Sequence, residues 1–91
     1  MSVYDDISVD CLNWMLIKSL RNLRNYTDRL RDLKSKVDWL SYIQAEEQND
    51  TVTINYYSKI NHSIWRLEMQ ISVNRKVVDD CRCHLADRMV Q

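Results

Sequence analysis

Glycine, proline and phenylalanine are absent from this sequence of 91 residues, although 45% of the residues are apolar. Glycine supplies the positive φ of tight turns and the close backbone approach to phosphates, and proline fixes turns and breaks helices. P-loops, Rossmann fingerprints, nucleophile elbows and most hairpin-rich β folds need glycine at set positions, so the sequence excludes them. We expect one small domain with few tight turns and long uninterrupted elements.

A net charge is also lacking, because 13 lysine and arginine residues balance 13 aspartate and glutamate residues. The chain therefore has no global attraction to nucleic acid or to an acidic membrane. The charges are nevertheless grouped: residues 21–36 carry six basic and two acidic side chains, and residues 38–50 carry only acidic ones. We expect these local charges to set the orientation of a partner.

Long apolar runs and an N-terminal secretion signal are missing as well. The most apolar window, residues 11–20, is too short to span a bilayer and contains Lys18. The three cysteines are an odd number, and Cys81 and Cys83 point to different faces of a helix because they are two residues apart. We therefore expect no membrane segment, reduced thiols, and an intracellular protein of the cytoplasm or the nucleus.

Apolar residues recur with a period of seven in both halves of the chain. The first half has the registers Val9, Leu16, Leu23, Leu30, Val37 and Leu12, Ser19, Tyr26, Leu33, Leu40. The second half has the registers Tyr57, Ile64, Ile71, Val78, Leu85 and Ile60, Leu67, Asn74, Cys81, Arg88. Seventeen of these twenty positions are apolar, against about nine expected from the composition. The repeat predicts two long helices with coiled-coil-like seams, at about residues 5–46 and 52–89, joined by a turn at about 47–51.

The predicted fold class is all-α, a long antiparallel helical hairpin in a single domain of residues 1–91. A hairpin of two helices leaves much of each helix in water, and small domains of this kind usually need a second copy or a partner. We therefore expect two hairpins to pair as a homodimer that forms a four-helix bundle. The alternative is a compact three-helix bundle, in which residues 1–20 break away and cover the open end.

The polar stretch between the two halves, residues 45–51, is the natural place for the turn. Asp50 or Thr51 can cap the second helix. Residues 51–56 alternate with a period of two and are rich in β-branched side chains, a pattern typical of a strand. We nevertheless predict helix there, because Ile54, Tyr57 and Ile60 continue the helical stripe.

Folding the two halves together about residues 48 and 49 predicts which side chains face each other. At the turn end the facing pairs are Leu40 with Tyr57 and Ile43 with Ile54. The open end is expected to pack more poorly, and its pairs are Ser19 with Val78, Leu16 with Cys81 and Val9 with Arg88. Asn74 faces Leu23 within the seam, and we interpret Asn74 as a register-setting residue that reduces stability.

Surplus apolar and aromatic side chains lie outside the seam in three groups, which include all three tryptophans. Tryptophan, tyrosine and methionine are enriched at interfaces. The predicted partner or self-association interface consists of Trp14, Met15, Ile17, Leu20, Trp39, Tyr42, Trp65, Met69, Val73, Val77 and Met89. We predict a non-enzymatic protein–protein interaction module that binds a larger protein through this apolar face, as an adaptor, an assembly chaperone or a small inhibitor.

Two other functions are compatible with the sequence. The first is a nucleic-acid-binding helical hairpin dimer that uses the basic stretch of residues 18–36, with phosphate contacts from Lys18, Arg21, Arg24 and Arg31. Two aspartates interrupt that stretch, and no aromatic repeat for base stacking accompanies it. The second is a purely structural coiled-coil subunit that assembles with itself.

The sequence predicts no catalytic residue, no cofactor and no metal site. The stretch richest in potential ligands is residues 79–84, where Asp80 and His84, or Cys81 and His84, share a helix face. Neither cysteine spacing matches a zinc knuckle, and Cys81 falls on the seam. A chain without glycine has no glycine-lined loop to build an oxyanion hole, so we expect no enzyme.

Overall fold

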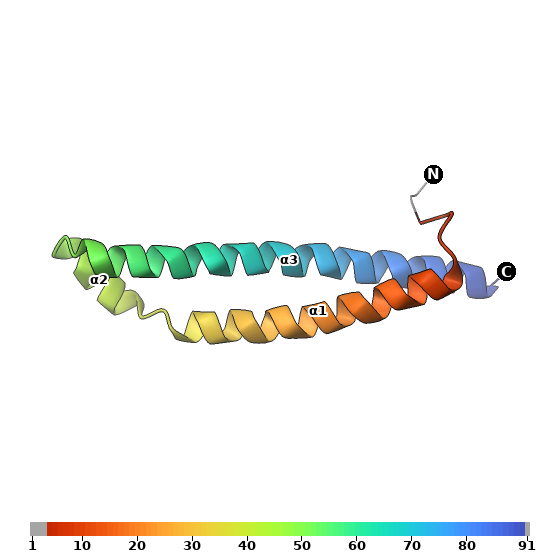
Figure 1. Ribbon diagram of the computed structural model, residues 1–91, viewed down its shortest axis with the longest axis horizontal. Helices are drawn as coiled ribbons and strands as arrows, with labels where there is room; N and C mark the ends of the chain where they lie inside the picture. The colour runs from red at the N-terminus through yellow and green to blue at the C-terminus, as the bar shows by residue number, and fades with distance from the viewer. Residues whose placement is uncertain (1–3, 91) are drawn as a thin grey trace.

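The computed structural model describes residues 4–90, and the side chains of residues 4–89. Three helices follow one another: α1 (Val9–Ser35), α2 (Trp39–Glu47) and α3 (Thr51–Val90). Helix α1 lies beside the C-terminal part of α3, and α2 packs at the N-terminal end of α3 (Figure 1). The described residues form no strand, and the molecule measures 65 by 23 by 15 Å. The chain is therefore all-helical and elongated.

Helix α1 begins at Val9 because Ser8 caps its first turn. The Ser8 Oγ accepts a hydrogen bond from the backbone N–H of Cys11 at 3.2 Å. The predicted start near residue 5 is therefore wrong. From Val9 onward α1 is continuous through residue 20 and beyond, so the alternative in which residues 1–20 break away from the rest is also wrong.

The predicted helix over residues 5–46 is interrupted at residues 36–38, between α1 and α2. At the end of α1, the Ser35 hydroxyl donates to the carbonyl of Asp32 at 2.6 Å. At the start of α2, the Asp38 carboxylate accepts the Ser41 hydroxyl at 2.8 Å and the backbone N–H groups of Leu40 and Ser41 at 3.1 and 3.4 Å. The hydrogen bonds from Ser41 lower the pKa of Asp38. These hydrogen bonds start a new helix at Trp39, although the seven-residue repeat predicts one continuous helix through this stretch.

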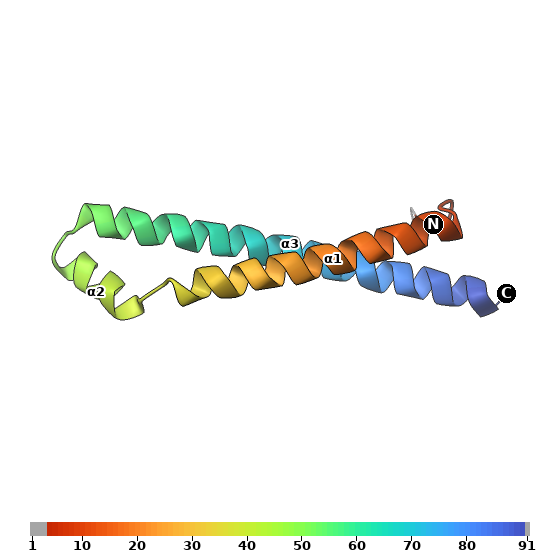
Figure 2. The same ribbon diagram turned by 60° about the horizontal axis from the view of Figure 1, so that its bottom comes forward.

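The interruption turns α2 about its own axis, so the predicted facing pairs at the turn end are wrong. Leu40 and Ile43, which the repeat assigns to the seam, are 66% and 50% exposed. Tyr42 and Ala45 pack inward instead: Ala45 is buried, and the Tyr42 ring meets the Tyr57 ring edge-on, with centroids 5.9 Å apart. Figure 2 shows that α2 is set at an angle to the line of α1.

Asn49 takes the place that glycine usually has at the end of a helix. Its φ is 54°, in the left-handed region. The Asn49 N–H donates to the Glu46 carbonyl at 3.3 Å, and the Asp50 N–H donates to the Ala45 carbonyl at 2.9 Å. This is the Schellman pattern, which satisfies the last carbonyls of α2. The chain thus makes the sharp turn between α2 and α3 without glycine.

Asp50 caps α3, one of the two capping residues that the sequence allows, the other being Thr51. Its carboxylate accepts the Thr53 hydroxyl at 2.7 Å and the Thr53 N–H at 3.3 Å, and these bonds lower the pKa of Asp50. Helix α3 covers residues 51–56 despite their β-branched alternation, so the prediction of helix there is confirmed.

Asn49→Gly is expected to raise the melting temperature by about 4–8 °C, because glycine adopts positive φ without the penalty of about 1 kcal/mol that a side chain imposes. Asn49→Val is expected to lower the melting temperature by at least as much. Thermal unfolding followed by circular dichroism measures both. Gln48 has an ordinary φ of −92° and is the control position, where glycine is expected to destabilise. A destabilised Asn49→Gly variant would contradict the described turn.

The core of the molecule is the seam between α3 and the two helices packed on it. The buried apolar side chains are Leu12, Ala45, Tyr57, Ile60, Leu67, Ile71, Val78 and Cys81. The six that belong to α3 all occupy predicted seam positions, so the repeat in the second half is confirmed. At the open end Leu12 and Cys81 are fully buried and Ser19 is also buried, whereas Val9, for which poorer packing was expected, is 45% exposed.

Asn74 lies half-buried between α1 and α3, and its partner is Asn22. The Asn22 Nδ2 donates to the Asn74 Oδ1 at 3.4 Å, and the Asn74 Nδ2 donates to the Gln70 carbonyl at 2.7 Å. One hydrogen bond thus joins the two amides, in a seam whose buried side chains are apolar except for Ser19. Their contact places residues 18–24 of α1 beside residues 72–78 of α3.

Candidate interaction surfaces

Large apolar side chains are exposed along the whole length of the hairpin. Among residues 4–89, those at least 40% exposed are Val9, Trp14, Ile17, Leu20, Trp39, Leu40, Ile43, Val52, Tyr56, Trp65, Met69, Val73 and Met89. The accessible surface is 7102 Å². A compact monomer of this mass exposes about 5,600 Å². The chain therefore exposes about 1,500 Å² more than a compact fold would.

Most of the predicted interface residues lie at the surface. The exposed ones are Trp14, Ile17, Leu20, Trp39, Trp65, Met69, Val73 and Met89. Met15, Tyr42 and Val77 are half-buried, Tyr42 because it packs against Tyr57. Leu40 and Val52 are also exposed, and the prediction did not include them. The sequence feature that could have predicted the exposure of Leu40 is the helix cap at Asp38.

These apolar side chains do not form one continuous face, because the hairpin has two different edges. An ion pair between Lys34 Nζ and Glu68 Oε1 at 3.4 Å marks the first, here called the Lys34 edge. Leu20 precedes Lys34 by two heptads and Trp65 precedes Glu68 by one turn, so both lie on this edge. The edge also holds a groove of about 450 Å³ lined by Lys34, Val37, Trp39, Asn61, Ile64 and Glu68.

The opposite edge carries the Asn22–Asn74 hydrogen bond and is here called the Asn22 edge. Met15 precedes Asn22 by one heptad and lies on this edge. Further along, this edge has an open groove of about 460 Å³ lined by Arg29, Asp32, Leu33, Lys36, Ser63, Arg66, Leu67 and Gln70. The lining of this groove carries both positive and negative side chains.

Five cations and no carboxylate surround the chain at the level of the Asn22–Asn74 bond. This basic band consists of Lys18, Arg21, Arg24, Arg75 and Lys76. All five side chains are exposed. The band contains three of the four predicted phosphate contacts, and the fourth, Arg31, lies outside it and pairs with Asp28 at 3.5 Å. The structure thus concentrates positive charge by adding α3 residues that the prediction did not include.

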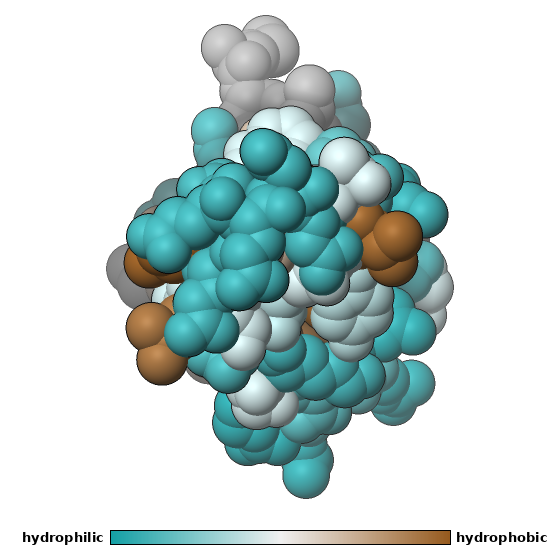
Figure 3. Space-filling model, turned by 90° about the vertical axis from the view of Figure 1, so that its left-hand side faces the viewer, coloured by the Kyte–Doolittle hydropathy of each residue, from teal (hydrophilic) through white to brown (hydrophobic). Residues whose placement is uncertain are grey.

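The turn end has the opposite charge and an aromatic cluster. Residues 37–58 contain Asp38, Glu46, Glu47 and Asp50 but no lysine or arginine. Edge-on ring contacts run from Trp39 to Tyr42 at 6.1 Å, from Tyr42 to Tyr57 at 5.9 Å and from Tyr56 to Tyr57 at 5.4 Å. Figure 3 looks onto this end and shows a hydrophilic tip with hydrophobic side chains on either side. We call residues 38–50 the acidic turn.

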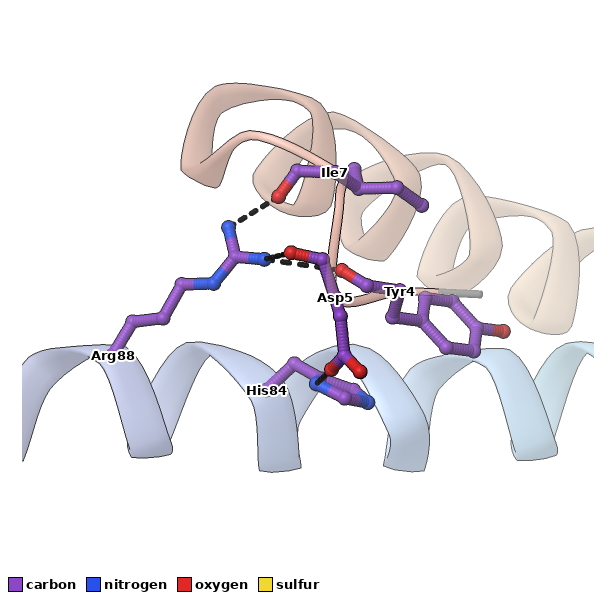
Figure 4. A network of polar contacts seen from close by, with 5 residues as sticks. All are labelled: Tyr4, Asp5, Ile7, His84 and Arg88. Carbon is purple, nitrogen blue, oxygen red and sulfur yellow. Dashed lines mark hydrogen bonds and ion pairs between the residues drawn. The ribbon is translucent and has the colours of Figure 1, made fainter. Parts of the chain in front are cut away.

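Residues 4–7 are fastened across the end of α3 by a network that we call the terminal clasp (Figure 4). The Arg88 guanidinium donates to the backbone carbonyls of Ile7, of Tyr4 at 3.0 Å and of Asp5 at 3.1 Å. The His84 ring lies 5.2 Å from the Tyr4 ring, and its Nδ1 is 3.9 Å from the Asp5 carboxylate. Burial, and to a lesser extent nearby Asp80, raises the pKa of Tyr4. No local sequence pattern indicates this contact, because it joins the two ends of the chain.

The potential ligand stretch of residues 79–84 is divided between the seam and the surface. Cys81 is fully buried, and burial together with the nearby Asp80 raises the pKa of its thiol. Cys11 and Cys83 are exposed. Within the described part of the chain, no three histidine, cysteine, aspartate or glutamate side chains converge at a distance that suits a metal ion. Each helix of residues 4–90 also falls short of the continuous apolar length that a bilayer crossing requires.

Comparison with known proteins gives no relative: no family model matches the chain, no curated protein matches its sequence, and no solved structure matches its fold. The chain's own surfaces are therefore the basis for proposing what it does.

Proposed function

We propose that this chain is a non-enzymatic protein–protein interaction module that binds a larger protein through its exposed apolar, tryptophan-containing surface. The observation that supports the proposal is the excess of about 1,500 Å² of exposed surface, to which Trp14, Trp39 and Trp65 all contribute. The thirteen large apolar side chains of residues 4–89 that are at least 40% exposed supply the apolar part of this surface. The excess is about twice the ~800 Å² that each partner buries in a standard interface.

Occupancy is the mechanism by which such a module acts. Trp14 is 62% exposed and is held from one side by Lys18, whose Nζ lies 4.9 Å from the ring centroid. An indole in this position fills a pocket of the partner and excludes water, as central interface tryptophans do. The charged faces then fix the orientation of the rod. An adaptor, an assembly chaperone and a small inhibitor all work in this way.

Trp14→Ala is expected to weaken binding of the partner at least thirtyfold, because a buried interface tryptophan contributes about 2 kcal/mol or more. The partner is captured from the native host with the wild-type chain, identified, purified and titrated by calorimetry. Val52→Ala is the control, since Val52 is 79% exposed on the far end of the molecule. A partner that binds both variants equally well would contradict the proposal.

Nucleic acid is a second candidate partner, which the basic band favours. Five cations at one level of the rod suit contacts with several phosphates. In this case the logarithm of RNA or DNA affinity falls steeply and linearly with the logarithm of salt concentration, and reversal of Arg21 and Arg24 to glutamate abolishes binding. A flat salt dependence would exclude this candidate.

A further inference from the structure

We propose that a second copy of this chain covers the Lys34 edge in an antiparallel, two-fold arrangement, with the acidic turn of each copy against the basic band of the other. The proposal rests on the proposed function, since it takes the exposed apolar surface to be an interaction surface and names one of its occupants. The larger protein then binds apolar side chains that this contact leaves exposed, such as Met69 and Val73.

Charge complementarity selects the second copy and its direction. The basic band has five cations and no carboxylate, and the acidic turn has four carboxylates and no cation. The two regions lie far apart on one rod, so neither neutralises the other within a single chain. An antiparallel neighbour brings each acidic turn to the other copy's basic band, whereas a parallel neighbour in register stacks like charges. The chain as a whole has no net charge that opposes self-association.

Apolar side chains on the same edge supply the contact between the charged regions. Ile17 and Leu20 lie beside the basic band, and Trp39 borders the groove of about 450 Å³ near the acidic turn. Trp65, which is 57% exposed, lies on this edge between them. The two-fold axis of this dimer lies midway between the basic band and the acidic turn, at the height of Trp65 along the rod. Rotation about this axis places α2 of each copy beside residues 17–24 of the other copy. The contact is therefore isologous and closes as a dimer.

The projected area of this contact is similar in size to a standard protein interface. The two rods overlap from residue 17 of α1 to the acidic turn, about 45 Å at 1.5 Å per residue. With a rod width of 23 Å, the overlap covers an area on the order of 1,000 Å² on each copy. A standard interface buries about 800 Å² per partner.

The test uses two charge-reversed forms of the full chain in sedimentation equilibrium at about 0.1 M salt. The turn-reversed form is Glu46→Lys with Glu47→Lys, and the band-reversed form is Arg24→Glu with Arg75→Glu. We expect wild type to be a dimer, and each reversed form alone to have a dimer Kd raised at least tenfold. An equimolar mixture is expected to form dimers again, because the introduced lysines of one form then face the introduced glutamates of the other, and the second contact is wild type. Circular dichroism confirms that these surface changes keep the helices.

Arg29→Glu with Arg66→Glu is the matched control, because it has the same net charge as the band-reversed form but lies on the Asn22 edge. We expect this control to dimerise like wild type and to form no dimers with the turn-reversed form. A wild-type chain that is monomeric at about 100 μM would overturn the inference, as would a mixture of the two reversed forms that stays monomeric. If the chain is monomeric but its partner still binds in a Trp14-dependent way, the proposed function holds and only the second copy is refuted.

Discussion

Leu12→Ala is expected to lower the free energy of unfolding by about 3 kcal/mol and the melting temperature by roughly 15 °C. Leu12 belongs to the seam between α1 and α3, and it and Cys81 are the two large side chains of residues 4–89 that are fully buried. Removing most of a leucine side chain there loses its transfer free energy and leaves a cavity that rigid helices fill only in part. A domain of this size has a total stability of only about 5–15 kcal/mol, so the loss is a large fraction of it. Chemical denaturation followed by circular dichroism measures the change.

Leu40→Ala is the matched control for that substitution. Leu40 and Leu12 share one register of the seven-residue repeat, so the sequence alone predicts similar losses. The structure leaves Leu40 66% exposed, and its truncation is expected to change the free energy of unfolding by about 0.5 kcal/mol or less. A loss at Leu40 as large as that at Leu12 would mean that α1 continues through residues 36–38 and that the Asp38 cap does not form.

Arg88→Ala is expected to speed the reaction of Cys81 with a thiol reagent about thirtyfold. The guanidinium holds residues 4–7 through the carbonyls of Ile7, Tyr4 and Asp5. Hydrogen bonds from a charged donor contribute about 1.5–3 kcal/mol, and loss of about 2 kcal/mol of local stability raises the open population about thirtyfold. Cys11 and Cys83 are exposed and react first. The reaction rate of Cys81, the slowest of the three thiols, therefore measures how often the clasp opens.

Arg82→Ala is the control for this second prediction. Arg82 is an exposed arginine of α3, six residues before Arg88, and it makes none of the three carbonyl contacts. Its removal is expected to leave the Cys81 rate within about twofold of wild type. Equal acceleration by both variants would show that α3 frays as a whole and that residues 4–7 do not protect this end.

The interruption at residues 36–38 shows why a repeat alone misplaces side chains. The repeat continues smoothly through Val37 and Leu40, and it assigns both to the seam. Asp38 and Ser41 form a cap from groups only three residues apart, and such local bonds form whichever face the following helix presents. The seven-residue repeat and the Asp38 cap therefore predict different orientations for residues 39–47. Only the packing of Tyr42 against Tyr57 shows that the cap determines the orientation.

The sequence by itself determined that the chain is helical, that α3 buries a stripe made of two positions in every seven, and that α3 begins at Asp50 or Thr51. These properties follow from interactions within a few residues of each other: helix propensity without glycine or proline, periodicity and capping. Only the tertiary structure decided that α2 turns Leu40 outward, that Asn22 pairs with Asn74, and that Arg88 fastens residues 4–7 over the open end. Each of those contacts joins residues distant in sequence or depends on the rotation of one helix on another. Their free energies are therefore fixed by the packed arrangement of the helices, which no local pattern encodes.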